Sequence, residues 1–138
     1  MNGNGLKTKG MKKEISKERP LISIITPVLN NAEYLEQTIQ SVIDQDYDNI
    51  EYIIIDGGST DGTLDIIKKY NDKINFWISE PDKGIYDAQN KGVSRATGKY
   101  FAVLNSGDFY AENDVVSKVA SKIKNQLNVD YIYSNNIS

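Results

Sequence analysis

The apolar positions of the chain follow two alternating patterns after Pro20. Continuous β-branched runs, typical of strands buried on both faces, are followed by segments with an apolar residue every three to four positions, which is typical of amphipathic helices. The runs predict strands at residues 21–28, 50–56, 74–80, 99–105 and 129–135. The intervening segments predict helices at residues 30–45, 59–71, 85–97 and 112–126. We expect the side chain of Asn30 to cap the first helix, and the third helix to be interrupted or to end near Gly92.

Strands that alternate with helices predict an α/β fold with a mainly parallel sheet and helices on both faces. Such sheets bind ligands outside the carboxyl ends of their strands. Four of the predicted strands end in polar, glycine-rich or acidic residues, namely Thr26-Pro27, Asp56-Gly57-Gly58, Ser79-Glu80 and Asn105-Ser106-Gly107-Asp108. We therefore expect a binding cleft at this edge. The chain stops just after the fifth strand, which predicts either truncation of a longer protein or a complete small domain with that strand at its edge.

Composition narrows the possible chemistry. The 138 residues suggest one folded domain, and the absence of Cys and His leaves acid–base and metal chemistry to Asp and Glu. Residues 1–19 hold six basic and two acidic residues, a net charge of +4, which leaves −7 for residues 20–138 of a chain whose total is −3. We predict a flexible basic leader, with weak attraction to anionic membrane as the alternative. The acidic remainder argues against nucleic acid as a partner, and no segment is long enough to span a membrane.

The segment "DGGSTDGT", residues 56–63, is the first candidate site. Its glycines permit close backbone approach, and Ser59 or Thr60 is expected to cap the helix that follows. A carboxylate at Asp56 would repel phosphate, so it suits an N–H or hydroxyl donor such as a base imide or a ribose. The alternative is an Asx turn that only connects strand to helix. No P-loop or dinucleotide-binding glycine motif is present, and the segment does not have the spacing of an EF-hand loop.

The segment "PDKGIYDAQNKG", residues 81–92, is the second candidate. Lys83 could reach a phosphate from the loop at the end of the third strand. Asp87 could lie near a nucleotide, or form an i, i+4 ion pair with Lys91. Asn90 could point into the cleft, or help to end the helix.

The "NSGD" turn is the third candidate, with Asp108 as a metal ligand. Mg²⁺ needs only one or two protein carboxylates when substrate phosphates and water complete its coordination. Asp108 is therefore sufficient if a diphosphate is present, and Ser106 could contact a sugar hydroxyl or a metal-bound water. The alternative is that Asp108 caps a helix or a turn.

In their order and spacing these motifs resemble the family 2 glycosyltransferases, which have a GT-A fold, over about residues 20–138. The resemblance rests on "ISIITPVLNNAEYLEQTIQSVIDQDYDNIEYIIIDGGSTDGT" and on "DKGIYDAQNKGVSRATGKYFAVLNSGD". It implies a Rossmann-like domain that binds a nucleotide-diphospho-sugar, often a UDP-sugar, with Mg²⁺ or Mn²⁺. It also implies transfer of the sugar to an acceptor hydroxyl with inversion. Surface polysaccharide synthesis, in the cytoplasm or at the inner face of the membrane, is the setting that it suggests.

The resemblance also implies roles for individual residues. Asp108 is the metal ligand, and Ser106 departs from the family's Asp-x-Asp pattern. The expected nucleotide-sugar-binding residues are Thr26, Pro27, Asn30, Asp56, Lys83, Asp87, Asn90, Ser106 and Gly107. The general base is expected beyond Ser138, so no catalytic residue is assigned in this chain, and we expect weak donor binding with little or no turnover. The alternative function is a nucleotide-binding module without catalysis. A nucleotidyltransferase or a flavodoxin-like domain fits the order of motifs less well.

Overall fold

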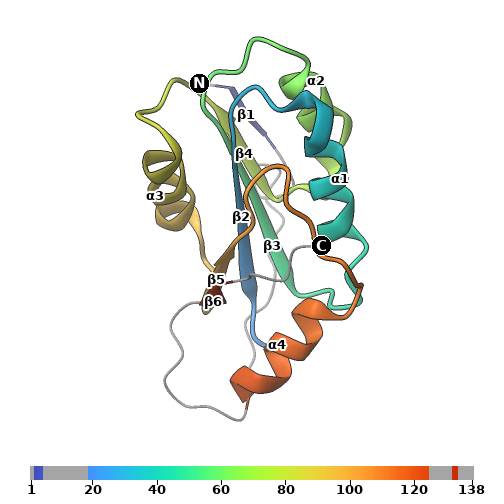
Figure 1. Cartoon of the computed structure of the whole chain (residues 1–138). Helices are drawn as coiled ribbons and strands as arrows, with labels where there is room; N and C mark the ends of the chain where they lie inside the picture. The colour runs from blue at the N-terminus through green and yellow to red at the C-terminus, as the bar shows by residue number, and fades with distance from the viewer. Residues whose placement is uncertain (1, 5–18, 125–131, 134–138) are drawn as a thin grey trace.

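The computed structural model describes residues 2–4, 19–124 and 132–133, and these form one sheet flanked by helices (Figure 1). The described strands lie in the order β1-β4-β3-β2-β5-β6. Their bounds are β1 Asn2–Asn4, β2 Ile22–Val28, β3 Ile50–Asp56, β4 Phe76–Ser79, β5 Tyr100–Val103 and β6 Ile132–Tyr133. All neighbouring pairs are parallel except β1 with β4. The predicted mainly parallel α/β sheet is confirmed.

Helices cover both faces of this sheet, as predicted. Figure 1 shows α1 and α2 on one side and α3 on the other. The helices are α1 Ala32–Ile43, α2 Thr63–Lys69, α3 Ile85–Arg95 and α4 Val115–Lys124, with a short 3-10 turn at Asn71–Lys73. Every residue of β2 and β3 is buried, which explains why both read as continuous apolar runs. Within the described residues, no helix is long and apolar enough to cross a membrane.

Alternate residues of β2 pack against opposite helical layers. Ile24 belongs to the core cluster that includes Leu35 of α1, whereas Ile25 belongs to the cluster that includes Ala88 of α3. A Cβ on Gly92 would lie 2.3 Å from Cγ2 of Ile25, so α3 approaches the sheet closely only because this residue is glycine. The prediction that α3 is interrupted or ends near Gly92 is wrong, because close packing on β2 outweighs the low helix propensity of glycine.

The N-terminal end of the chain differs from the prediction, whereas the described part of the last strand lies where it was predicted. Asn2–Asn4 lies in the predicted flexible leader, yet it pairs antiparallel with β4, with Asn2 opposite Ser79. The open edge of β4 offers main-chain N–H and C=O groups, which a short segment can pair with whatever its side chains are. Residues 5–18 lie outside the described residues. Of the predicted fifth strand, Ile132–Tyr133 is described and runs parallel to β5, and the rest lies outside the described residues.

The predicted helix caps are wrong at both helices that follow the central strands. The N-cap positions are Asn31 for α1 and Gly62 for α2, and neither makes a side-chain cap hydrogen bond. Asn30 has a left-handed φ of 49°, and its side chain accepts a hydrogen bond from Thr60 in the loop after β3 instead. The hydroxyl of Ser59 bonds back to the end of β3. Asn30 and Ser59 bond between the loops that follow β2 and β3, so their side chains do not cap the helices.

Candidate functional site

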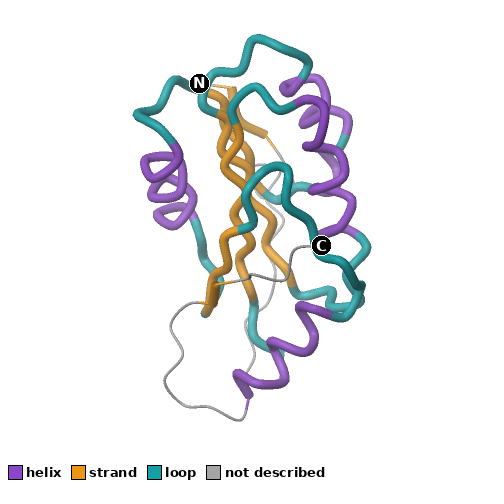
Figure 2. Tube along the Cα trace, viewed as in Figure 1, coloured by secondary structure: helices purple, strands orange, loops and turns teal. Residues whose placement is uncertain are grey.

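The loops that follow β2, β4 and β5 enclose a cavity at the carboxyl ends of the strands. Figure 2 shows these connections in teal. The cavity has a volume of ≈ 360 Å³, within the range typical of small-molecule sites. Its lining residues are Pro27, Val28, Leu29, Asn30, Asn31, Asp82, Gly84, Ile85, Ala88, Asn105 and Ser106. The edge of the sheet predicted for ligand binding therefore carries a cavity of suitable size.

Asp56 lies at the end of β3 and is completely buried. Its Oδ2 accepts hydrogen bonds from the Gly58 N–H at 3.2 Å, the Ser59 N–H at 2.9 Å and the Ser79 hydroxyl at 2.7 Å. Its Oδ1 accepts one from the Ser59 hydroxyl. These four donors match the about four acceptor sites of a carboxylate. The Asx turn is thus present, and Asp56 also joins the ends of β3 and β4.

Asn30 lines the cavity and also fixes the neighbouring loop. Its Oδ1 accepts hydrogen bonds from the N–H groups of Thr60, at 2.8 Å, and Asp61, at 3.3 Å. A further hydrogen bond joins the same two loops, because Oδ2 of Asp61 accepts the Ala32 N–H at 3.1 Å. The hydroxyl of Thr63 and then the N–H groups of Thr63 and Ala32 hold the pKa of Asp61 below its usual value. The loops after β2 and β3 therefore form one rigid rim.

The loop that carries Asp108 is held by polar side chains at and within α1. The amide of Asn31 donates to the hydroxyl of Ser106 at 2.7 Å. The buried hydroxyl of Thr38 accepts the N–H of Gly107 at 2.9 Å. Gly107 has a φ of 96°, a left-handed conformation that suits glycine at this turn. Ser106, at the predicted Asp-x-Asp position, is thus engaged in holding the loop against α1.

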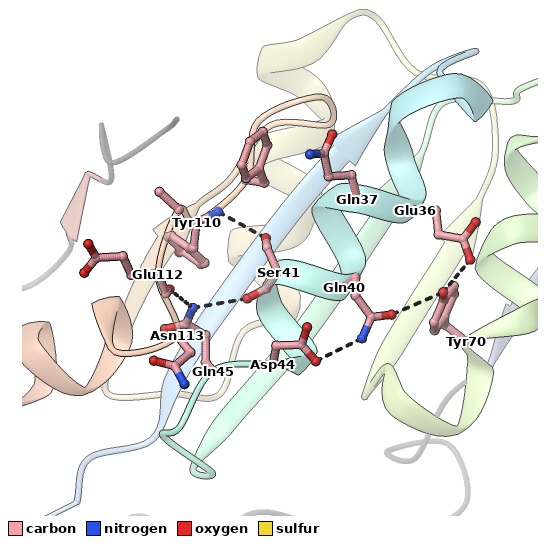
Figure 3. Close-up of a pocket in the computed structure, with 12 residues that line it drawn as sticks. Glu36, Gln37, Gln40, Ser41, Asp44, Gln45, Tyr70, Tyr110, Glu112 and Asn113 are labelled. Carbon is pink, nitrogen blue, oxygen red and sulfur yellow. Dashed lines mark hydrogen bonds between the residues drawn. The ribbon is translucent and has the colours of Figure 1, made fainter.

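The same loop continues along α1, as Figure 3 shows. Ser41 accepts the Tyr110 N–H at 3.1 Å, and Gln45 donates to the Glu112 carbonyl at 2.7 Å. A second cavity of ≈ 580 Å³, here called the α1 groove, lies beside these contacts and is bordered on its other side by Tyr70. At that border, hydrogen bonds from Lys69 and then Tyr70 lower the pKa of Glu36. None of the predicted site residues lines the α1 groove.

Asp108 is half-buried beside this tethered turn, and its N–H donates to the Asn105 carbonyl at 3.0 Å. Among the described residues its carboxylate makes no recorded hydrogen bond or ion pair, so the alternative of a side-chain cap is not supported. The described residues also contain no cluster of three or more Asp or Glu side chains that could hold a metal alone. One free carboxylate fits a hard cation that shares its coordination with a diphosphate.

The two predicted site residues of β2 have different environments. Thr26 is completely buried, and its hydroxyl lies 2.9 Å from the hydroxyl of Tyr52 in the core beneath α1. Burial raises the pKa of Tyr52, so this pair is neutral and structural. Thr26 therefore does not line the cavity, because its side chain points into the core. Pro27 does line it, and its carbonyl also accepts the Ser106 N–H at 3.3 Å.

The predicted site residues at and near α3 do not line the cavity. Asp87 accepts the N–H of Lys83 at 2.9 Å and forms an ion pair of 3.8 Å with Lys91. The predicted i, i+4 pair is therefore present. The side chains of Lys83 and Asn90 are exposed.

Eight of the residues that line the cavity were not predicted as site residues, and three of them matter for binding. Asp82 follows β4 and is half-buried, while Leu29 and Ile85 are large apolar side chains with exposed fractions of 56% and 48%. Asp82 could have been found in the same way as Asp56, because each is a carboxylate at or shortly after the end of a strand. Ile85 is the first residue of α3 and Leu29 lies three residues before α1, and their exposure in the folded structure is what marks them as binding surface.

Comparison with known proteins assigns the family. The family described as Glycosyl transferase family 2 matches residues 23–136. TuaG of Bacillus subtilis, a glycosyltransferase named for teichuronic acid biosynthesis, is 43% identical over 93 residues, which are 65% of this chain and 37% of TuaG. The chain spans less than half of the length of this relative.

Solved structures share the fold. Residues 1–349 of S. aureus TarS in complex with UDP-GlcNAc match with a TM-score of 0.69 and 26% identity, over 75% of this chain and 31% of that one. A mannosyltransferase from Pyrobaculum calidifontis in complex with GDP-Man and Mn²⁺ matches with a TM-score of 0.67 and 23% identity, over 77% of this chain and 32% of that one. The match to residues 23–136 covers most of the chain, and the predicted resemblance is confirmed: the chain belongs to glycosyl transferase family 2.

Proposed function

We propose that the chain forms the donor-binding part of a glycosyltransferase that uses a nucleotide-diphospho-sugar. The observation that carries this proposal is the cavity at the carboxyl ends of the strands, which has apolar walls and a carboxylate, Asp82, and is bordered by the loop that holds Asp108. Family membership supports the reaction class. The UDP-GlcNAc bound by TarS, which shares the fold, supports a UDP-linked donor as the first choice to test.

Asp108 is the proposed ligand of a divalent cation, Mg²⁺ or Mn²⁺, which it shares with the donor diphosphate. Its carboxylate is free in the described structure, and one carboxylate is enough for a metal that phosphates and water complete. When bound, the cation stabilises the charge that develops on the departing diphosphate. Ser106 and Gly107 hold Asp108 in place through their bonds to α1, and they form the floor of the site beneath the diphosphate.

The other predicted residues take supporting roles in this proposal. Pro27 and Asn30 form the wall on which the nucleoside lies. Asp56 acts on the nucleotide through the turn that it fixes. Lys83 follows the lining residue Asp82, and its exposed ammonium group is proposed to attract phosphate.

Two residues of α3 complete the assignment. Asp87 holds the backbone of Lys83 through a bond of 2.9 Å, which fixes the loop that carries Asp82 and Lys83. Asn90 is exposed one turn further along α3, and we assign it a contact with the donor sugar.

Inverting transfer needs a base on the face opposite to the leaving diphosphate. We propose that this base, a carboxylate, lies outside the chain, because Asp82 is the one acidic residue among the described residues that line the cavity. The chain would then bind donor and turn it over slowly or not at all. The same observation favours the second candidate function, a nucleotide-binding module without catalysis.

The acceptor is proposed to be a growing surface glycan or its lipid-linked precursor. The naming of TuaG for teichuronic acid biosynthesis supports this class of product. Such an acceptor would be met in the cytoplasm or at the inner face of the membrane, where the basic residues of the leader would favour anionic lipid.

Calorimetry tests the donor site. We expect UDP, alone or as a UDP-sugar, to bind more tightly with Mn²⁺ than without it. Asp108→Asn should weaken the metal-dependent affinity by about tenfold or more, since a charged ligand is replaced by a neutral one. Glu112→Gln is the matched control, because Glu112 is exposed and pairs with Lys118 at 3.7 Å, away from the cavity. Absence of nucleotide binding, or metal dependence that survives Asp108→Asn, contradicts the proposal.

A further inference from the structure

We propose that Asp82 selects the base of the bound nucleotide, favouring bases that carry an N–H on the ring, such as uracil and guanine. This inference rests on the proposed function, since it concerns the same cavity. It assigns to Asp82 the contact that the sequence had suggested for Asp56.

Asp56 is unsuited to contact a ligand directly. It is fully buried, and both of its carboxylate oxygens already accept hydrogen bonds, four in total, from Gly58, Ser59 and Ser79. A base could be bound only by displacing one of these donors, which would be left without a partner inside the protein. Asp56 is therefore a positioning residue.

Asp82 has the opposite arrangement. Its Oδ1 accepts the Gly84 N–H at 3.0 Å, which fixes the orientation of the carboxylate. In the described part of the chain, Oδ2 accepts no recorded hydrogen bond, and Asp82 lines the cavity. A Cβ on Gly57 would lie 2.7 Å from this Oδ2. The glycine at the end of β3 thus leaves room for a carboxylate supplied by the β4–α3 loop.

The surroundings of Asp82 suit a flat, partly apolar ring. Leu29 and Ile85, both among the large exposed apolar residues, line the same cavity as this carboxylate. An apolar ring with one N–H at its edge satisfies both features, because the N–H can donate to Oδ2 while the ring faces cover the apolar side chains. The negative charge of Asp82 repels phosphate from its own carboxylate, so the diphosphate is directed toward Asp108 and the exposed ammonium group of Lys83.

Pairs of nucleotides in which one ring nitrogen does or does not carry a hydrogen test this inference. Uracil carries an N–H at N3 where cytosine has a lone pair, and guanine carries one at N1 where adenine has a lone pair. We expect the chain with Mn²⁺ to bind UDP more tightly than CDP, or GDP more tightly than ADP, by roughly ten- to a hundredfold, the size of one charge-assisted hydrogen bond. Asp82→Asn should bring this ratio to about one or invert it, because the amide can donate to the lone pair.

Two further variants separate base selection from folding. Gly57→Ala keeps the charge of Asp82 but forces its carboxylate away, so the ratio should also fall. Glu80→Gln is the matched control in the same loop, since Glu80 pairs with Lys91 at 3.3 Å outside the cavity, and its ratio should equal that of the wild type. Tight UDP or GDP binding with an unchanged ratio in Asp82→Asn overturns this inference and leaves the proposed function intact. Absence of binding by the wild type overturns both.

Discussion

Thr38→Val tests whether α1 positions the metal-binding turn. The hydroxyl of Thr38 is fully buried and accepts the N–H of Gly107 at 2.9 Å. Valine has nearly the same shape and the same branching at Cβ, so the packing of α1 is kept while the acceptor is lost. The N–H next to Asp108 is then left without its partner.

The expected cost follows from that single change. A buried donor without an acceptor costs about 1–3 kcal/mol, and the half-buried N–H of Gly107 sets the cost toward the lower end of that range. The hydroxyl's own bond to the Tyr34 carbonyl, at 3.4 Å, is too long to add much. We expect the free energy of unfolding to fall by about 1–3 kcal/mol. Because the loosened residue adjoins Asp108, the Mn²⁺-dependent affinity for UDP should fall by several-fold, and Thr38→Ser should restore both quantities.

Denaturant unfolding and calorimetry with UDP and Mn²⁺ measure the two effects. Ser94→Ala is a suitable control, since Ser94 is exposed and its hydroxyl donates to the Lys91 carbonyl within α3. It should change stability by less than about 0.5 kcal/mol. The reasoning is refuted if Thr38→Val is as stable as the wild type. It is also refuted if Thr38→Val loses stability but keeps the full metal dependence of UDP binding.

Two further predictions concern the fold around the site. Gly92→Ala should destabilise the chain by about 1–3 kcal/mol, because the added methyl group overpacks against Ile25. The higher helix propensity of alanine offsets this by up to about 1 kcal/mol. Denaturant midpoints of Gly92→Ala, alone and combined with Ile25→Val, would measure the effect. Asp61 has a lowered pKa, caused first by the Thr63 hydroxyl, so its stabilisation is present above its usual pKa and is lost as pH falls through the lowered value. Asp61→Asn should therefore flatten the decline in stability below about pH 4, and an unchanged acid limb in a pH series of unfolding curves would contradict this.

The sequence predicts the layers of the fold because the burial of each element determines the pattern of apolar residues within it. β2 and β3 read as continuous apolar runs, and the helices read as periodic ones. The ends of the predicted strands then place Pro27 and Ser106 at the same edge of the sheet. β1 was missed for a physical reason, since an edge strand pairs through its main chain and needs no apolar pattern.

The site was harder to predict because its roles depend on contacts between distant segments. Asp56 and Asp82 are both carboxylates at or shortly after the end of a strand. The hydroxyl of Ser79, 23 residues from Asp56, is the distant donor that completes the four hydrogen bonds to Asp56. Likewise, Asn31 meets Ser106 across 75 residues. The contact between α1 and the loop of Asp108 did have a local signal in the sequence, because Thr38 and other polar residues recur at helical spacing on α1.

NMR of the isotopically labelled chain with UDP and Mn²⁺ tests the central claim most directly, because paramagnetic broadening locates the metal and shifts locate the base. The account predicts that the amide signals of Gly107 and Asp108 broaden first. With Mg²⁺ in place of Mn²⁺, UDP should shift the signals of Gly57 and Gly84, which adjoin Asp82. Broadening centred instead on the acidic side chains of the α1 groove, with Gly57 and Gly84 unmoved, would contradict it.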